Sequence, residues 1–194
     1  MLTPKLALLF TGHRVDAVNR DPKKRRFPPT AEAETRARRL IYDAVRMQVG
    51  ADAAASVGIS GGASGGDILF HEVCAELGVT TELLLALPVA EFQKFSVQDG
   101  GERWVARFKA LCARVPPRIM PPSKESPMEG KFWEENNLWL LSSTLALQAD
   151  RQVLIALYNQ ELDPDGGGGT AHLVEKAGER GVEVVRVDAR SLLK

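Results

Sequence analysis

The chain has 194 residues, 44% of them hydrophobic, so it can bury a substantial core and we expect a single domain spanning residues 1–194. Lys plus Arg and Asp plus Glu each number 25, and a net charge of zero disfavours nucleic acid or another polyanion as a partner. The apolar run at 6–10 is too short for a signal-peptide core, and no apolar stretch approaches the roughly 18 residues of a spanning helix, which predicts a cytoplasmic protein with no membrane partner.

Short apolar runs alternate with amphipathic ones along the chain. Thr30 follows two prolines and opens an amphipathic stretch, the pattern of a capped helix. The runs of Val, Leu and Ile are nearly continuous, which indicates strands buried on both faces. In chain order we predict a strand at 5–12, a helix at 30–50, a strand at 54–60, a helix at 65–78, a strand at 80–88, helices at 99–114 and 136–150, a strand at 151–159, a helix at 169–181 and a strand at 182–188. This order predicts an α/β fold with a doubly wound, mostly parallel Rossmann-like sheet and helices on both faces.

Two segments depart from this alternation. Residues 15–29 carry Pro, Asn, Asp and five basic residues, and residues 115–131 contain five of the eleven prolines. Both are predicted to be loops. Long loops in a compact α/β domain are uncommon unless they cover a site, and a Pro-rich crossover on the far side of the sheet is the alternative. Cys74 and Cys112 lie far apart within helix-like patterns, which favours reduced buried thiols over a disulfide.

A first glycine-rich turn, "SGGASGGD" at 60–67, directly follows a predicted strand and opens a predicted helix. Ligands of doubly wound sheets bind beyond the carboxyl ends of the strands, where helix N-termini attract anions. We interpret the bare backbone as a phosphate cradle, with hydroxyl donors from Ser60 and Ser64 and with Asp67 capping the helix or receiving a ribose hydroxyl. The alternative is a tight strand-to-helix turn in which glycine is needed for its positive φ. The glycines of this turn are Gly61, Gly62, Gly65 and Gly66.

A second glycine-rich turn and a third loop follow other predicted strands. "GGGGT" at 166–170 precedes the last predicted helix, and "TGHR" at 11–14 follows the first strand. We therefore predict one shared ligand site in which Arg14 clamps a phosphate and His13 donates a hydrogen bond or acts as an acid. The predicted ligand contacts from these two segments are Gly12, His13, Arg14, Gly166, Gly167, Gly168, Gly169 and Thr170.

The remaining motifs exclude several kinds of chemistry. His71 and His172 are interpreted as helix-surface or cap residues, and no pair of histidines has a metal-ligand spacing, so we expect neither a metal nor a cofactor. No lysine follows the first glycine-rich turn as Walker A requires, and the dinucleotide fingerprint GxGxxG is absent after the first strand. The sequence therefore does not support P-loop phosphoryl transfer or hydride transfer.

The motifs "LLFTGHRVD", "RFPP", "GISGGASGGDILFHEVCAELGV", "LALP" and "GGGGTAHLVEKAGERGVEV", in this order, resemble the SLOG superfamily of Rossmann-like domains. This group includes the DNA-uptake protein DprA and the Lonely Guy phosphoribohydrolases. The chain looks closest to SLOG-like segments found beside nucleotide cyclase and tetratricopeptide regions in bacteria. The resemblance covers about residues 6–187 and implies that the two glycine-rich turns bind a nucleotide or a nucleotide-derived ligand.

The resemblance leaves two functions open. The phosphoribohydrolase pattern PGGxGTxxE is incomplete here, because Asp165 stands where the proline would be and the glutamate after the threonine has no clear counterpart. The leading expectation is therefore a sensor or carrier domain for a nucleotide or an ADP-ribose-type ligand. The alternative is an enzyme that cleaves the N-glycosidic bond of a nucleoside monophosphate, with a carboxylate from Asp67, Glu72 or Glu175. A DNA-handling role is disfavoured by the zero net charge, and homo-oligomer formation and a separate effector protein stay open.

Overall fold

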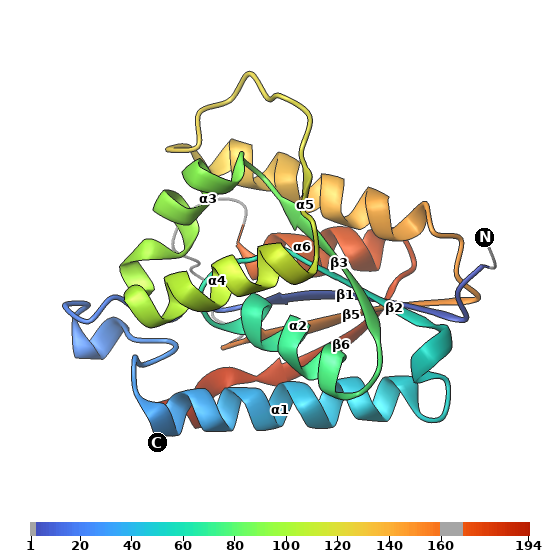
Figure 1. The fold of residues 1–194 in the computed structure, drawn as a ribbon, viewed down its shortest axis with the longest axis horizontal. Helices are drawn as coiled ribbons and strands as arrows, with labels where there is room; N and C mark the ends of the chain where they lie inside the picture. The colour runs from blue at the N-terminus through green and yellow to red at the C-terminus, as the bar shows by residue number, and fades with distance from the viewer. Residues whose placement is uncertain (1–2, 160–168) are drawn as a thin grey trace.

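The fold is built on a parallel β-sheet (Figure 1). The computed structural model describes residues 3–159 and 169–194. Within these ranges the sheet has six strands in the order β4-β3-β2-β1-β5-β6, and every neighbouring pair is parallel. The strands are β1 (Leu6–Gly12), β2 (Ser56–Ser60), β3 (Thr80–Leu85), β4 (Arg118–Ile119), β5 (Arg151–Tyr158) and β6 (Glu183–Asp188).

Helices cover both faces of the sheet, as the sequence predicted (Figure 1). α1 packs beside α2 on one face, and α5 packs beside α6 on the other. The predicted doubly wound Rossmann-like fold is therefore confirmed. Within the described ranges the α-helices are α1 (Ala31–Val49), α2 (Gly66–Glu76), α3 (Val89–Ser96), α4 (Glu102–Arg114), α5 (Gly130–Leu145) and α6 (Thr170–Glu179).

Successive residues of β1 contribute to two separate hydrophobic cores. Leu8 and Phe10 face the core beneath α1 and α2, while Leu9 faces the core beneath α5 and α6, and all three are at most 1% exposed. Because neighbouring side chains of a strand point to opposite faces, a strand covered on both sides must be apolar at every position. The Phe10 ring stacks on Phe70 of α2, with 4.8 Å between the ring centroids.

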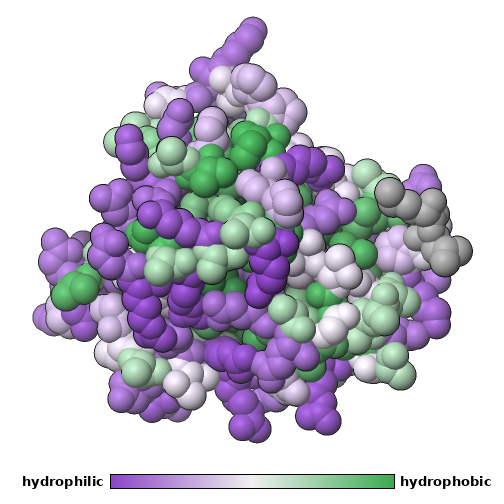
Figure 2. Space-filling model, viewed as in Figure 1, coloured by the Kyte–Doolittle hydropathy of each residue, from purple (hydrophilic) through white to green (hydrophobic). Residues whose placement is uncertain are grey.

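Local signals fix several element boundaries. Thr30 caps α1 by accepting a hydrogen bond from the backbone N–H of Ala33. Trp104, Phe108 and Leu111 share the buried face of α4. The face shown in Figure 2 carries mainly polar residues with apolar residues scattered among them. Among the helices of the described chain, none combines the length and the apolar character needed to cross a bilayer.

Three elements differ from the predictions. α3 is only eight residues long and was not predicted. Pro88 stands at its N-cap position. β4 is a two-residue strand inside the predicted loop at 115–131. α5 begins at Gly130, before the predicted start at 136. Residues 131–135 are charged or aromatic and do not continue the apolar pattern from which that start was predicted. The other predicted boundaries agree with the structure to within a few residues.

The strand order places a topological switch point between β1 and β5. From β1 the chain builds outward through β2, β3 and β4, and it then returns to the other side of β1 to form β5 and β6. The connections that leave β1 and β5 therefore run to opposite faces of the sheet, and a crevice opens beyond the carboxyl ends of these two strands. Ligands of open α/β sheets bind at this position.

Candidate functional site

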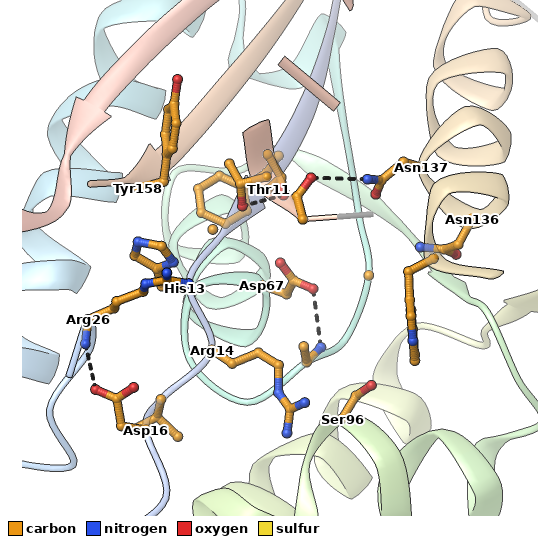
Figure 3. Close-up of a pocket in the computed structure, with 18 of the residues that line it drawn as sticks. Thr11, His13, Arg14, Asp16, Arg26, Asp67, Ser96, Asn136, Asn137 and Tyr158 are labelled. Atoms are coloured by element: carbon orange, nitrogen blue, oxygen red, sulfur yellow. Dashed lines mark hydrogen bonds between the residues drawn. The ribbon is translucent and has the colours of Figure 1, made fainter. Parts of the chain in front are cut away.

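A cavity of about 550 Å³ lies at the switch point, beyond the carboxyl ends of β1 and β5. Its size is within the range of small-molecule sites, roughly 300–1,000 Å³. Its walls come from the turn after β1, the turns that enter α2 and α6, the end of α3, one face of α5 and the segment 15–26. Figure 3 shows side chains from these separate parts of the chain facing one space.

Half of the predicted site residues that the structure describes line this cavity. The first glycine-rich turn and the described part of the second both reach it, as the shared-site hypothesis requires. The predicted residues that line it are Gly12, His13, Arg14, Gly61, Asp67, Gly169 and Thr170. Those that the structure places elsewhere are Ser60, Gly62, Ser64, Gly65, Gly66, Glu72 and Glu175. Gly166, Gly167 and Gly168 lie outside the described residues.

The second half of the first glycine-rich turn packs against protein backbone. Gly65 has a φ of +103°, and a Cβ at this position would lie 2.6 Å from the backbone nitrogen of Val15. The turn is bound to the segment after β1 by hydrogen bonds from Val15 N to Ser64 O (2.9 Å) and from Gly66 N to His13 O (3.1 Å). Gly65 and Gly66 therefore have a packing function, which is the alternative that the sequence left open.

Gly61 and Asp67 form the part of this turn that faces the cavity. The Asp67 carboxylate accepts a hydrogen bond from the backbone N–H of Ala63 (3.2 Å), and a Cβ on Gly61 would lie 2.8 Å from Asp67 Oδ2. Burial raises the pKa of Asp67 to about 7, although hydrogen bonds to its charged form and the nearby Arg14 oppose this shift. A carboxyl group with this pKa in a cavity exchanges a proton near neutral pH, as a general acid or base must.

His71 is fully buried, so its interpretation as a surface or cap residue was wrong. Burial lowers the pKa of His71 to about 4, which keeps the ring neutral at neutral pH. Its Nε2 lies 3.0 Å from the carbonyl oxygen of Gly61, and in the neutral ring this nitrogen carries the proton and donates to that oxygen. His71 thus fixes the orientation of the Gly61 peptide at the cavity floor.

The turn after β1 is held by both of its polar side chains. The Arg14 guanidinium donates to the carboxylate of Asp99 and to the carbonyl oxygen of Phe95 (3.0 Å). The Nε of Arg14 is buried and has no hydrogen-bond partner among the described residues. The Nε2 of His13 accepts a hydrogen bond from the backbone N–H of Asn159 (3.1 Å), which ties β1 to the end of β5.

The N-terminus of α6 is anchored in its described part by side chains from two other elements. The hydroxyl oxygens of Thr170 and Thr11 lie 3.3 Å apart, and Asn137 of α5 donates to the carbonyl oxygen of Gly169 (3.2 Å). The same amide lies 3.4 Å from His172 Nδ1, so this histidine contacts the wall of the site. The first turn of a helix offers backbone N–H groups and a positive dipole end, and at α6 this end borders the cavity.

The three predicted carboxylates are separated by the structure. Asp67 alone among them lines the cavity. Glu72 lies on α2 and binds the Arg107 guanidinium with hydrogen bonds of 2.8 and 2.5 Å. The Glu175 side chain is 65% exposed and lies 3.7 Å from Lys176 Nζ. If this site performs acid-base chemistry, Asp67 is the one of the three that is placed to take part.

Sequence reasoning missed two walls of the cavity. The first is α5, whose Asn136 and Asn137 directly precede the apolar run at 138–141, so these polar residues were visible in the sequence. The second is the loop at 15–29, for which covering a site was one of two interpretations; the structure places part of it at the cavity, but its side chains were not assigned to a site. Asp16 holds this loop by accepting hydrogen bonds from Arg26 N (2.9 Å) and Phe27 N (2.8 Å), and burial raises the pKa of Asp16. The missed lining residues with polar or aromatic side chains include Thr11, Asp16, Asn19, Arg20, Arg26, Phe92, Ser96, Asp99, Trp133, Asn136, Asn137, Tyr158 and Asn159.

Among residues 3–159 and 169–194, no group of three or more His, Cys, Asp or Glu side chains is arranged to hold a metal ion. No protein-family model, curated protein or solved structure matches the chain. The site at the switch point, with the N-terminus of α6 and Arg14 at its edges, is therefore the basis for any assignment of function.

Proposed function

We propose that the cavity between β1 and β5 binds a nucleotide or a nucleotide-derived ligand such as ADP-ribose, and that the protein acts as a sensor or carrier of this ligand. The observation that carries the proposal is the position of the α6 N-terminus, which borders a cavity of about 550 Å³ at the topological switch point. The SLOG resemblance of the glycine-rich turns points to the same class of ligand.

The groups around the cavity suit a phosphate-containing ligand. The backbone at Gly169 and Thr170 offers N–H donors and the positive end of the α6 dipole. Arg14 also lines the cavity, and its buried Nε–H has no hydrogen-bond partner among the described residues. Asp67 is partly protonated near neutral pH because burial raises its pKa to about 7, and this reduces its repulsion of an anion.

Isothermal titration calorimetry tests the binding proposal. The ligands are ADP-ribose and the monophosphates of adenosine, guanosine, cytidine and uridine. Ala171 lines the cavity in the first turn of α6, so Ala171→Phe should obstruct it and abolish binding. Glu175 lies four residues further along the same helix and is exposed, so Glu175→Phe is the matched control and should bind like the wild type. Equal affinities of the two variants would refute the proposed site.

Hydrolysis of an N-glycosidic bond is the second candidate function, and the environment of Asp67 favours it. A carboxyl group with a pKa of about 7 can protonate a leaving base or activate a water molecule. For a sensor, we expect no release of free base from nucleoside monophosphates at enzyme concentrations that would reveal a single turnover. If base is released, Asp67→Asn should slow it by roughly two to four orders of magnitude, while Glu72→Gln and Glu175→Gln should leave it unchanged.

A further inference from the structure

One face of α5 forms a continuous, uncharged wall of the cavity. Trp133, Asn136, Asn137 and Leu140 all line the cavity, and their spacing of three and four residues places them on one side of the helix. The segment 15–26 contributes charged side chains instead, including Asp16, Arg20 and Arg26. The labelled asparagines lie on one side of the site in Figure 3, and Asp16 and Arg26 lie on the other. The cavity therefore has one aromatic and amide wall and one charged wall.

The two asparagines of α5 differ in their use by the fold. Asn137 donates to the carbonyl oxygen of Gly169 and so anchors the N-terminus of α6. Asn136 Oδ1 is buried and has no hydrogen-bond partner in the described part of the chain. Leaving a polar atom buried without a partner costs roughly 1–3 kcal/mol. Because Asn136 lines the cavity, a rotation of its amide brings this oxygen to a bound ligand, which can supply the missing partner.

Trp133 is held rigidly beside Asn136. Its indole N–H donates to the carbonyl oxygen of Pro127 (3.0 Å), and its ring packs edge to face against Phe132 with 5.2 Å between centroids. A fixed aromatic ring that lines a cavity offers a surface on which a flat heterocycle can stack. Leu140, one helical turn beyond Asn136, adds an apolar contact to the same wall.

We propose that Trp133 and Asn136 form the subsite for the heterocyclic base of the ligand, with Trp133 contacting the face of the base and Asn136 reading its edge. This inference rests on the proposed nucleotide binding and adds the orientation of the ligand. The base lies against α5, and the phosphate lies toward Arg14 and the α6 N-terminus. A rotation of 180° about the terminal torsion of Asn136 exchanges its oxygen and nitrogen, so the amide can match a donor or an acceptor on a base.

The test compares ligands with and without a base. Calorimetry with the four nucleoside monophosphates identifies the one that binds best, and ribose 5-phosphate is measured by competition against it. Asn136→Leu keeps the branched shape and the number of side-chain heavy atoms but removes the hydrogen-bonding groups, and should weaken binding of that nucleotide by about three- to tenfold. Trp133→Leu removes the stacking surface and should weaken it at least about fivefold. Neither substitution should change the affinity for ribose 5-phosphate by more than about twofold.

Conservative variants and controls separate base recognition from loss of structure. Trp133→Phe keeps an aromatic face and should restore most of the nucleotide affinity lost in Trp133→Leu. Thermal unfolding of each variant identifies any that fails to fold, and Asn136→Leu provides the test if Trp133→Leu does. An equal loss of affinity for nucleotide and ribose 5-phosphate, or no loss for either, would overturn the base subsite while leaving nucleotide binding in place. Absence of binding of every nucleotide to the wild type would overturn the proposed function and this inference together.

Discussion

The turns that enter α2 and α6 are both glycine-rich, but the structure anchors them differently. The turn into α2 is held by backbone hydrogen bonds, from Val15 N to Ser64 O, from Gly66 N to His13 O and from Ser64 N to Ser96 O. The described part of the turn into α6 is held by side chains, namely Asn137 bound to Gly169 O and Thr11 beside Thr170. The second half of the first turn is a structural junction, whereas its residues Gly61 and Asp67 and the start of α6 border the cavity.

Two glycines of the turn into α2 also have different functions. Gly65 is required because another backbone segment approaches it closely and because its φ is +103°. Gly61 leaves space for the Asp67 carboxylate beside the cavity. Substitutions in the second half of the α2 turn should therefore act on folding, whereas substitutions at the α6 turn should act on ligand binding.

Among substitutions that distinguish the two turns, Gly65→Ala should have the largest effect, on the free energy of unfolding. Its Cβ would lie 2.6 Å from Val15 N, so the α2 turn must move away from the segment after β1, and the strain of a positive φ adds to this cost. Gly101→Ala is the matched control, since Gly101 has a φ of +94° and open space around its Cβ position. We expect Gly101→Ala to lower the free energy of unfolding by about 1–3 kcal/mol, and Gly65→Ala by several kcal/mol more. Chemical denaturation measures both, and equal losses would show that the close approach is unimportant.

The second prediction concerns Asp67 and the pH dependence of the free energy of unfolding. Its pKa is raised from 3.8 to about 7 in the folded protein, so between these values the folded state binds a proton that the unfolded state has lost. The free energy of unfolding due to Asp67 therefore falls as the pH rises through this window. His71, with its pKa lowered from 6.5 to about 4, has the opposite effect between pH 4 and 6.5.

Comparison with Asp67→Asn isolates the contribution of Asp67, because both proteins retain His71. The stability of Asp67→Asn relative to the wild type should increase between pH 5 and pH 8 by an amount on the order of a few kcal/mol. Urea denaturation at several pH values measures this difference. A difference that is constant across the range would show that Asp67 titrates normally.

Ligand affinity should also depend on the ionisation of Asp67. ADP-ribose is a suitable probe because its pyrophosphate keeps its charge between pH 6 and pH 8. Ionised Asp67 would repel this charge in the shared cavity, so the wild-type affinity should fall by about tenfold over this range. Calorimetry with Asp67→Asn should give a nearly flat profile. A flat wild-type profile would place the phosphates away from Asp67.

The smallest effect is expected for the side-chain anchor of α6. Asn137→Leu removes the hydrogen bond to Gly169 O and should destabilise the first turn of α6 by about 1 kcal/mol. Amide hydrogen exchange in this turn should accelerate by about fivefold, while exchange in α2 should not change. Comparable acceleration in α2 would mean that the two turns are not anchored independently.

The sequence was a good guide to the fold and to the location of the site. The nearly continuous apolar runs of β1 and β5 indicate strands buried on both faces, and the chain order then determines a doubly wound sheet. The positions of Gly12, Gly61 and Gly169 after strands predicted that they would meet at one edge. These features depend on local patterns and on general rules of chain connection.

The remaining features depend on tertiary contacts that leave little trace in a single sequence. The roles of Gly61 and Gly65 differ because one borders a cavity and the other meets the backbone of Val15. His71 is polar but buried, because the Gly61 carbonyl supplies its hydrogen-bond partner. Asn136 and Asn137 were visible as polar residues directly before an apolar run, but which of them anchors Gly169 follows only from the packing of α5 against α6.

The most direct test of nucleotide binding is a crystal structure of the protein grown with saturating ADP-ribose. We expect ligand density beyond the carboxyl ends of β1 and β5, with a phosphate oxygen within hydrogen-bonding distance of the backbone N–H groups at the start of α6. Density for the ligand at another surface, or a cavity without ligand in crystals grown under these conditions, would contradict it.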